Sequence, residues 1–292
     1  MRRFIAAAAL LIAPAVFAHD HEHHRNMNVT TDDDEINSCD QIRVSFDHEA
    51  ALRAEEELPV GSLRSLKVTT DTNSGVRVAG WDQARYAVTV CKFAADGATL
   101  ADVHPRLGGN EITLAGPDSD KQWYTFLIVH TPSNAQLDVS THNGPVSLQH
   151  VNGTLNLRAQ NGPLSLRDSS GTIDAVTVNG PISLSGGSGN VKISATNGPV
   201  SVKLSGARWD GTLDARTQNG PLSLRLPRTF GSGVDLTVDR GPISCKADAC
   251  RDLKRSWHDD DNDRPRKLSF GSGARNVTLS TVNGPVVVKE SD

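Results

Sequence analysis

The sequence predicts an all-β chain that folds as a single-chain parallel β-solenoid, with two short strands in each coil of about 18 residues. Three observations predict it. Glycines recur every nine residues from Gly144 to Gly198, alternate members of this series stand in Asn-Gly-Pro, and apolar and polar residues alternate after each glycine. A fixed short period is typical of solenoids, in which each repeat stacks on its neighbour. Two nine-residue units then make one coil.

The Asn-Gly-Pro tripeptide marks one corner of each predicted coil. Proline disfavours a helical conformation of the glycine before it and has no N–H to donate, so the tripeptide suits the start of a strand. Stacked asparagine side chains can hydrogen-bond from coil to coil. The tripeptide begins at Asn143, Asn161, Asn179, Asn197, Asn219 and Asn283, and Arg240-Gly241-Pro242 replaces it once. We expect a structural role for this column of corners.

The residues after each glycine alternate in polarity. Val146-Ser147-Leu148 and Ile182-Ser183-Leu184 place apolar residues on either side of a serine. A period of two indicates strands with one buried face. The sequence therefore predicts a thin core of Val, Leu and Ile between the strands of each coil.

The chain divides into three predicted segments. Residues 1–18 are typical of a Sec-type signal peptide with cleavage after Ala18, because two arginines precede a short apolar run that ends in small residues. Residues 19–38 are polar and lack Phe, Trp and Tyr, which predicts a disordered His- and Asp-rich arm. Residues 39–292 form the β-solenoid domain, with an irregular capping half (39–135) and regular coils with C-terminal insertions (136–292).

Four stretches of the capping half carry weaker patterns. Residues 66–80 predict strands on either side of a Ser74-Gly75 corner, and Trp123 to Val129 predicts a strand. Residues 50–60 fit a helix or an alternating strand, and residues 95–107 fit a short helix that Pro105 interrupts or ends.

Charge and apolar content indicate where the protein works. Loss of Arg2 and Arg3 with the signal peptide changes the formal net charge from -4 to -6. An acidic chain argues against nucleic acid as a partner. No further segment is apolar enough to span a bilayer. We expect a periplasmic or extracellular protein.

The four cysteines predict two disulfides, because secreted proteins meet an oxidising environment. Three pairings are possible. Cys39–Cys91 with Cys245–Cys250 is favoured, since each bond then closes a plausible loop. The competing interpretation, a metal site, would require closer Cys or His partners.

Several stretches resemble a known family. The GVRVAGWD stretch (75–82), the strand that ends in IVHTP (128–132) and the run of NGP[VIL]S[LV] coils are similar to the bacterial putative-adhesin β-solenoid family of unknown function. The resemblance implies a parallel β-solenoid in an exported protein. It implies no catalytic residues, because the family supplies none.

Insertions interrupt the nine-residue step at one corner of successive coils. Between the Asn-Gly-Pro corners the series continues with glycines outside this tripeptide. Gly211 comes 13 residues after Gly198, Gly233 comes 13 after Gly220, and Gly273 comes 32 after Gly241. Insertions along one edge of a solenoid often build its binding face, although they can equally form a cap over the core. The candidate ligand-binding edge consists of Arg208, Trp209, Asp210, Arg228, Phe230, Trp257 and His258.

A second candidate site is a charged face. Cations recur five residues after the corner glycines, and serines recur two residues before these cations, both on the outward side of the predicted strands. Such a face can bind a polyanion, or it can simply keep the surface soluble and deter edge pairing. The candidate anion-binding residues are Arg167, Lys203, Arg225, Lys246 and Lys289.

A third candidate site is the arm. Cleavage after Ala18 would give a chain that begins His19-Asp20-His21, and a terminal amine, two amides and a third-position histidine suit the square-planar geometry of Cu(II) or Ni(II). His23 and His24 add nitrogen ligands. Such binding can be adventitious, so we expect no resident cofactor.

Together these features predict an exported, non-enzymatic, adhesin-like protein that binds a surface component of the cell envelope, such as an acidic polysaccharide. Two alternatives remain open. One is a periplasmic metal-binding protein that uses the His arm, and the other is a polysaccharide-active enzyme at the inserted edge. No Ser/His/Asp or Cys/His set can be assembled from the spacing, which argues against catalysis.

Overall fold

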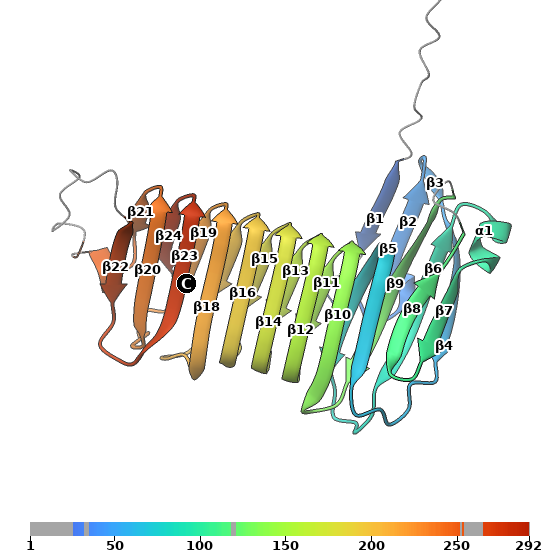
Figure 1. The fold of residues 1–292 in the computed structure, drawn as a ribbon, viewed down its shortest axis with the longest axis horizontal. Coiled ribbons are helices and arrows are strands. Elements are labelled where there is room, and N and C mark those ends of the chain that lie inside the picture. The colour runs from blue at the N-terminus through green and yellow to red at the C-terminus, as the bar shows by residue number, and fades with distance from the viewer. Residues whose placement is uncertain (1–25, 32–34, 118–120, 252, 254–264, 292) are drawn as a thin grey trace, which may run out of the picture.

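A computed structural model describes residues 26–31, 35–117, 121–251, 253 and 265–291 of the 292 (Figure 1). These residues form strands β1 to β24 with two short α-helices, α1 (Gly97–Ala101) and α2 (Asp248–Arg251), and a 3-10 helix at Cys39–Gln41. The predicted all-β class is confirmed. No helix among the described residues is long and apolar enough to cross a membrane.

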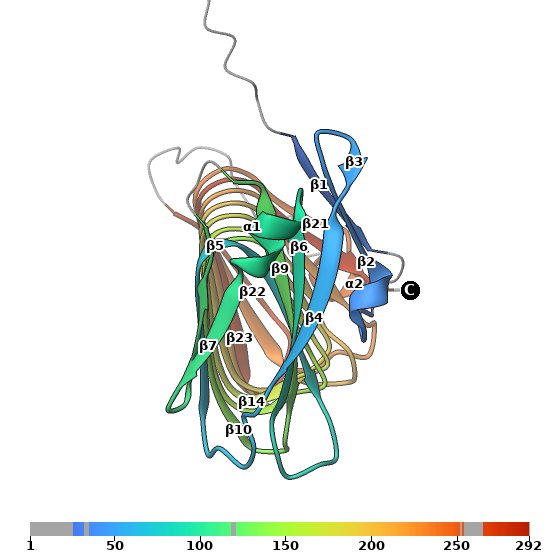
Figure 2. The same ribbon diagram turned by 90° about the vertical axis from the view of Figure 1, so that its right-hand side faces the viewer.

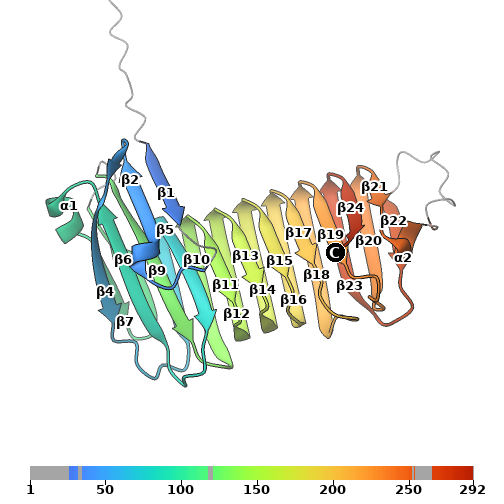
Figure 3. The same cartoon turned by 180° about the vertical axis from the view of Figure 1, so that it is seen from behind.

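Two sheets run the length of the molecule (Figures 1 and 3). In spatial order, sheet 1 contains β7 (His104–Gly108), β8 (Glu111–Ala115), β5 (Leu66–Gly80), β10 (Ala135–Asn143), β12 (Asn152–Asn161), β14 (Ser170–Asn179), β16 (Gly189–Asn197), β18 (Gly211–Asn219), β23 (Arg275–Asn283), β20 (Gly233–Arg240) and β22 (Arg266–Phe270). Sheet 2 contains β4 (Leu52–Leu58), β6 (Ala87–Ala94), β9 (Trp123–Thr131), the second half of β5, β11 (Val146–Gln149), β13 (Leu164–Arg167), β15 (Ile182–Ser185), β17 (Val200–Lys203), β19 (Leu222–Leu226), β24 (Val286–Glu290) and β21 (Ile243–Cys245).

The pairing between coils is parallel where the repeat is regular. Leu155 of β12 lies beside Ile173 of β14, and Leu164 of β13 lies beside Ile182 of β15, so neighbouring strands are 18 residues apart. Each sheet as a whole is mixed, because β4, β6, β7 and β22 pair antiparallel with their neighbours. The uniformly parallel arrangement predicted from the repeat therefore does not extend to the whole chain.

The two sheets face each other in the end-on view of Figure 2. The core lies between them and follows the alternation in the sequence. Val146, Leu148, Leu164 and Leu166 are all 1% exposed, and the serines between them are only half-buried. Burial of aliphatic side chains from both sheets is the main stabilising contribution to such a stack. The stack of coils can therefore extend only as far as apolar and polar residues keep alternating along the strands.

The corner glycines permit the coils to stack closely. A Cβ at Gly162 would lie 2.1 Å from the carbonyl oxygen of Gly144, and one at Gly180 would lie 2.2 Å from that of Gly162. No larger residue fits at these positions without displacing the backbone. The asparagines before them form the predicted ladder. Asn161 donates from Nδ2 to Asn143 Oδ1 (2.9 Å), and Asn179 donates likewise to Asn161 (2.8 Å).

The last two coils do not follow chain order. β18 and β19 pair with β23 and β24, whose other edges pair with β20 and β21. We call β23 and β24 (residues 275–290) the C-terminal coil, and β20 and β21 (233–245) the end coil. The C-terminal coil lies between the coil of β18 and β19 on one side and the end coil on the other (Figures 1 and 3). If each coil stacked on the one before it in the chain, the end coil would instead lie between the coil of β18 and β19 and the C-terminal coil.

A third sheet covers the outer face of sheet 2 at the N-terminal end (Figure 2). It consists of β1 (Met27–Thr31), β2 (Ile42–Phe46) and β3 (Glu49–Ala50), all antiparallel. Ile42, Val44 and Phe46 pack with Tyr124 and Phe126 of β9 in a separate apolar cluster. The prediction of a disordered arm over 19–38 is therefore wrong for residues 27–31, whose Val29 packs against a surface that the composition of the arm does not reveal.

Both predicted disulfides are present. Cys39 bonds to Cys91 with a Cα–Cα distance of 5.4 Å, which fastens the third sheet to β6, and Cys245 bonds to Cys250 at 6.0 Å. The ambiguous stretch at 50–60 contains the edge strand β4. The predicted short helix is α1, where Asp96 accepts a hydrogen bond from the Thr99 backbone N–H (2.8 Å), but it ends at Ala101 and Pro105 lies in β7 rather than at its end.

Candidate functional site

The predicted cations form a column on the outer face of sheet 2. Parallel register places Arg167 beside Ser185, Ser185 beside Lys203, Lys203 beside Arg225, and Arg225 beside Lys289. Lys246 continues the series at the end coil, where its N–H donates to Val288 O (2.8 Å). We call these residues the cation column; its members, in spatial order, are Arg167, Lys203, Arg225, Lys289 and Lys246.

Three members of the column are well placed to bind an anion. Lys203, Arg225 and Lys289 are exposed and stand on three consecutive strands. Among the described residues, none of the ion pairs includes these three side chains. Neighbouring strands lie about 4.8 Å apart, so the three charges are within a Debye length of one another and repel. An anionic chain that lies across the strands would relieve this repulsion.

A column of serines runs beside the cations. Ser147, Ser165, Ser183, Ser201 and Ser223 are in register, and Ser223 Oγ donates to Ser201 Oγ at 3.1 Å. The C-terminal coil then introduces Val287 between Ser223 and Ser244. The predicted serine column is real but interrupted once, because the coil order differs from the chain order.

The third sheet covers the N-terminal end of this face. Arg77 of β5 is only 4% exposed, and its Nη2 donates to Gln149 Oε1 (2.8 Å). Gln149 in turn donates from Nε2 to Glu35 Oε1 (2.6 Å). Burial is the main factor that lowers the pKa of the Arg77 guanidinium, which still remains charged. The accessible part of the face therefore begins at Arg167.

The predicted ligand-binding edge is largely taken up by packing. Trp209 and Phe230 are 3% and 7% exposed and belong to the main core. Trp209 donates from Nε1 to Gly189 O (3.0 Å), which fixes its ring inside the widened corner. Neither aromatic side chain is available to a ligand.

The polar members of that edge do not converge on a common site. Arg228 pairs with Glu290 (3.0 Å) and with Asp248 (3.7 Å), whereas Arg208 and Asp210 are exposed. Trp257 and His258 lie outside the described residues. The insertion after Gly220 has a topological reason, since the chain from β19 to β20 must cross the width of the C-terminal coil.

The predicted metal site of the arm also lies outside the described residues, because His19, His21, His23 and His24 precede Asn26. Among the residues that the structure does describe, no group of three or more His, Cys, Asp or Glu side chains is close enough to hold a metal ion. Metal binding by the arm stays a prediction.

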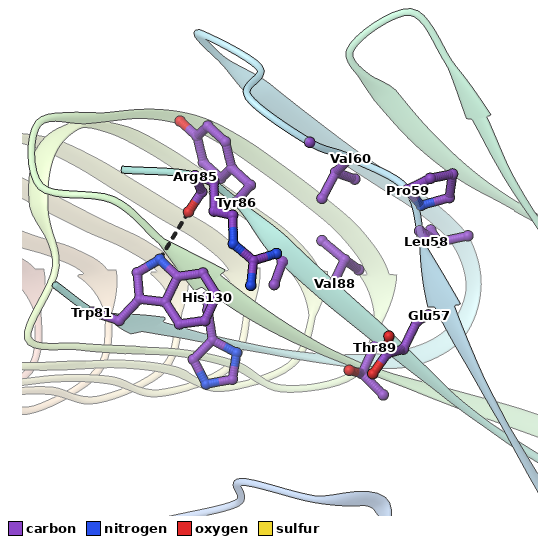
Figure 4. Close-up of a pocket in the computed structure, with 12 residues that line it drawn as sticks. Glu57, Leu58, Pro59, Val60, Trp81, Arg85, Tyr86, Val88, Thr89 and His130 are labelled. Atoms are coloured by element: carbon purple, nitrogen blue, oxygen red, sulfur yellow. Dashed lines mark hydrogen bonds between the residues drawn. The ribbon is translucent and has the colours of Figure 1, made fainter. Parts of the chain in front are cut away.

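A pocket that the sequence did not predict lies at the N-terminal end (Figure 4). It has a volume of about 620 Å³ and is lined by the end of β4, the start of β6, the loop after β5 and His130 of β9. Trp81 stacks on His130 with a centroid distance of 5.0 Å, and the Arg85 guanidinium carbon lies 5.2 Å from the centroid of the Trp81 ring. Trp81 Nε1 donates to Arg85 O (2.8 Å).

Two aromatic residues of this pocket have their polar groups hydrogen-bonded within the protein. The Tyr86 hydroxyl donates to Gln136 O (3.0 Å) and accepts from Gln136 N (3.1 Å), and burial raises its pKa. Burial and, secondarily, the charge of Arg77 lower the pKa of His130, so its imidazole is neutral near pH 7. These contacts favour a structural role. The run from Trp81 to Tyr86, with two aromatics in an aromatic-poor chain, was the signal in the sequence.

Comparisons with known proteins leave the family open. Neither protein-family models nor curated proteins give a match to the chain. A solved structure titled a putative cell adhesion protein from Clostridium sporogenes matches 82% of this chain and 100% of its own at 10% identity and a TM-score of 0.31. Another, titled a putative adhesin from Bacteroides fragilis, matches 82% and 97% at 11% identity and a TM-score of 0.38. The resemblance to the putative-adhesin family stays a prediction.

Proposed function

We propose that the protein is an exported β-solenoid that binds a linear polyanion of the cell envelope or cell surface through the cation column, without catalysing a reaction. One observation carries the proposal. Lys203, Arg225 and Lys289 stand exposed on three spatially consecutive strands, and none of the ion pairs among the described residues includes them.

The geometry of the column favours an acidic polysaccharide over a compact anion. The cations are spaced by the strand separation along the long axis of the molecule, so a ligand that contacts all of them must be extended. Lys and Arg bind carboxylates through charge-assisted hydrogen bonds, and Arg225 can form two of them. The hydroxyls of Ser201 and Ser223 lie in the neighbouring column, where they can accept and donate hydrogen bonds to sugar hydroxyls.

The two disulfides support the expected compartment. Cys39–Cys91 and Cys245–Cys250 would be reduced in most cytosols, whereas they persist in the periplasm or outside the cell. Envelope and surface polysaccharides are exposed in the same compartments. The protein and the proposed ligand would therefore occur in the same compartment.

Binding of polygalacturonate to purified protein tests the proposal. Replacing Lys203, Arg225 and Lys289 with serine, the residue that Ser185 already supplies in this column, removes three charges. At about 0.5 kcal/mol for each exposed contact, we expect the triple variant to bind roughly tenfold more weakly. Added salt should weaken the wild-type complex in the same direction.

A matched control removes the same charges elsewhere. Lys192, Arg208 and Lys267 are exposed and outside the column, and their triple serine variant has the same net charge. It should bind as the wild type does. Equal losses in the two variants would mean that only net charge matters, and chain cleavage of the polysaccharide would contradict the non-enzymatic role.

A further inference from the structure

The C-terminal coil fills a slot between two walls that precede it in the chain. One wall is formed by β18 and β19, and the other by β20 and β21 of the end coil. All four wall strands end at or before Cys245, whereas the C-terminal coil begins at Arg275. The walls are therefore synthesised, and can be exported, before the segment that separates them.

The contacts at the end of the coil join it to both walls. Ser291 N donates to Leu226 O (2.9 Å), next to the connection that leads from β19 to β20. Glu290 pairs through Oε2 with Arg228 of that connection (3.0 Å) and accepts at Oε1 from the Asp248 backbone N–H (3.0 Å). The C-terminal coil is thus held by the ion pair and hydrogen bond of Glu290 as well as by its strand pairing with both walls.

The coil contributes four fully buried side chains to the core, Val277, Leu279, Val286 and Val288. Its outward-facing residues, such as Thr278 and Lys289, are exposed. The covalent link to β22 is the segment 271–274, Gly-Ser-Gly-Ala, whose four residues are all exposed. Gly271 has a φ of +85°, a conformation that other residues rarely adopt. The segment is short, exposed and rich in glycine. Two backbone hydrogen bonds hold it to the start of the end coil, from Gly273 N to Gly231 O (2.9 Å) and from Gly233 N to Ala274 O (2.8 Å), and these must open if the segment is to act as a hinge.

We propose that two copies of this chain exchange their C-terminal coils, so that the slot of each copy holds the coil of the other. The strand pairings, ion pairs and buried contacts of the coil itself would re-form in the exchanged dimer. Only the 271–274 segment would change its path, with the loss of its two backbone hydrogen bonds to Gly231 and Gly233. The occupant is a second copy, since its coil carries the residues that match both walls in register. The proposal goes beyond polyanion binding and does not depend on it.

Cysteine pairing between full-length chains tests the exchange. Ser223 of β19 and Val287 of β24 are direct neighbours on the outer face of sheet 2. One chain carries Ser223→Cys and the other Val287→Cys, and the two are unfolded and refolded together at high concentration. Mildly acidic conditions without reductant keep the added thiols protonated and the native disulfides intact. Oxidation after refolding then links cysteines that have become neighbours.

Exchange predicts a disulfide-linked heterodimer after joint refolding, and none when the chains are refolded separately and then mixed. The control partner is Ser165→Cys, which lies in the same serine column but four strands from Val287. At about 4.8 Å per strand it is too distant for a disulfide. Equal linkage with Ser165→Cys, or no linkage with Ser223→Cys, would overturn the proposal.

A measurement on the unmodified chain does not depend on folding of the variants. Wild-type protein refolded at increasing concentration should contain a rising fraction of dimer, measured by light scattering after size-exclusion chromatography. Isolated dimer should return to monomer only after renewed unfolding, because the coil must leave the slot. A chain that stays monomeric at every concentration would also reject the exchange.

Discussion

Asn283 donates a hydrogen bond from Nδ2 to Oδ1 of Asn219 at 2.8 Å, although the two residues are 64 positions apart and Arg240 occupies the equivalent corner between them in sequence. Arg240 lies instead on the far side of Asn283, in the end coil. The asparagine ladder is therefore continuous in space through Asn143, Asn161, Asn179, Asn197, Asn219 and Asn283, and it ends at the one corner that lacks asparagine.

Replacing an asparagine in the middle of this ladder should destabilise the protein. Asn179→Ala removes its bond to Asn161 (2.8 Å) and the bond that it accepts from Asn197 (3.0 Å). At about 1 kcal/mol for each bond, we expect the free energy of unfolding to fall by about 2 kcal/mol, measured by urea denaturation. The control Thr172→Ala, at an exposed position near the start of the same strand β14, should change the free energy of unfolding by less than about 0.5 kcal/mol. If Asn179→Ala and Thr172→Ala lowered the free energy of unfolding equally, the asparagine ladder would not contribute specifically to stability.

Adding one methyl group at a corner glycine should be more damaging still. In Gly180→Ala the new Cβ would lie 2.2 Å from the carbonyl oxygen of Gly162, which is backbone and cannot move aside as a side chain would. We expect a loss of about 3 kcal/mol or more, or failure to fold. Gly97→Ala is the matched control, because no atom lies within 4 Å of its added Cβ. A tolerated Gly180→Ala would contradict close stacking at the corners.

Trp209 distinguishes a packed corner from a ligand-binding edge. Because its side chain is buried, Trp209→Ala should lower the free energy of unfolding by about 3–5 kcal/mol. The neighbouring Arg208→Ala removes an exposed side chain and should be neutral within about 0.5 kcal/mol. A Trp209→Ala protein that keeps its stability but no longer binds polygalacturonate would instead restore the predicted edge as a binding site.

His130 should contribute to acid sensitivity. Its pKa in the folded protein is lowered by burial and by Arg77, whereas the unfolded chain binds a proton near pH 6.5. As pH falls through 6.5 the unfolded state is therefore protonated first, and stability declines until the pH passes the folded pKa. His130→Gln should show a smaller difference in the free energy of unfolding between about pH 7.5 and 5. An unchanged difference would mean that other groups govern the acid response.

The regular coils were predictable because their signals are local. The nine-residue step fixes which residues lie side by side from coil to coil, as the register of Leu164 with Ile182 shows, and the alternation fixes which of them are buried. The cation column follows from the same register, so the sequence also predicted Lys203 beside Arg225. Signals of this kind need no knowledge of distant contacts.

The inserted C-terminal coil, the β1 strand and the pocket around Trp81 were not predictable in this way. The position of each of these features depends on contacts between segments that are far apart in the sequence. Strand β1 packs on an apolar face of β9. Strand β23 pairs with β20, which is near in the sequence, and also with the more distant β18. Chain order is a good guide to spatial order only while each coil stacks on the one before it.

The sequence by itself determined the all-β class, the 18-residue coil and the faces on which the core and the cations lie, and it favoured the cysteine pairing that the structure contains. Only the tertiary structure decided the order of the last coils, the burial of Trp209 and Phe230, and the extent of the face that remains accessible. The physical reason is that periodicity specifies neighbours through hydrogen-bond register, whereas the choice among several compatible edges depends on packing and side-chain contacts that are complete only when the whole chain has folded.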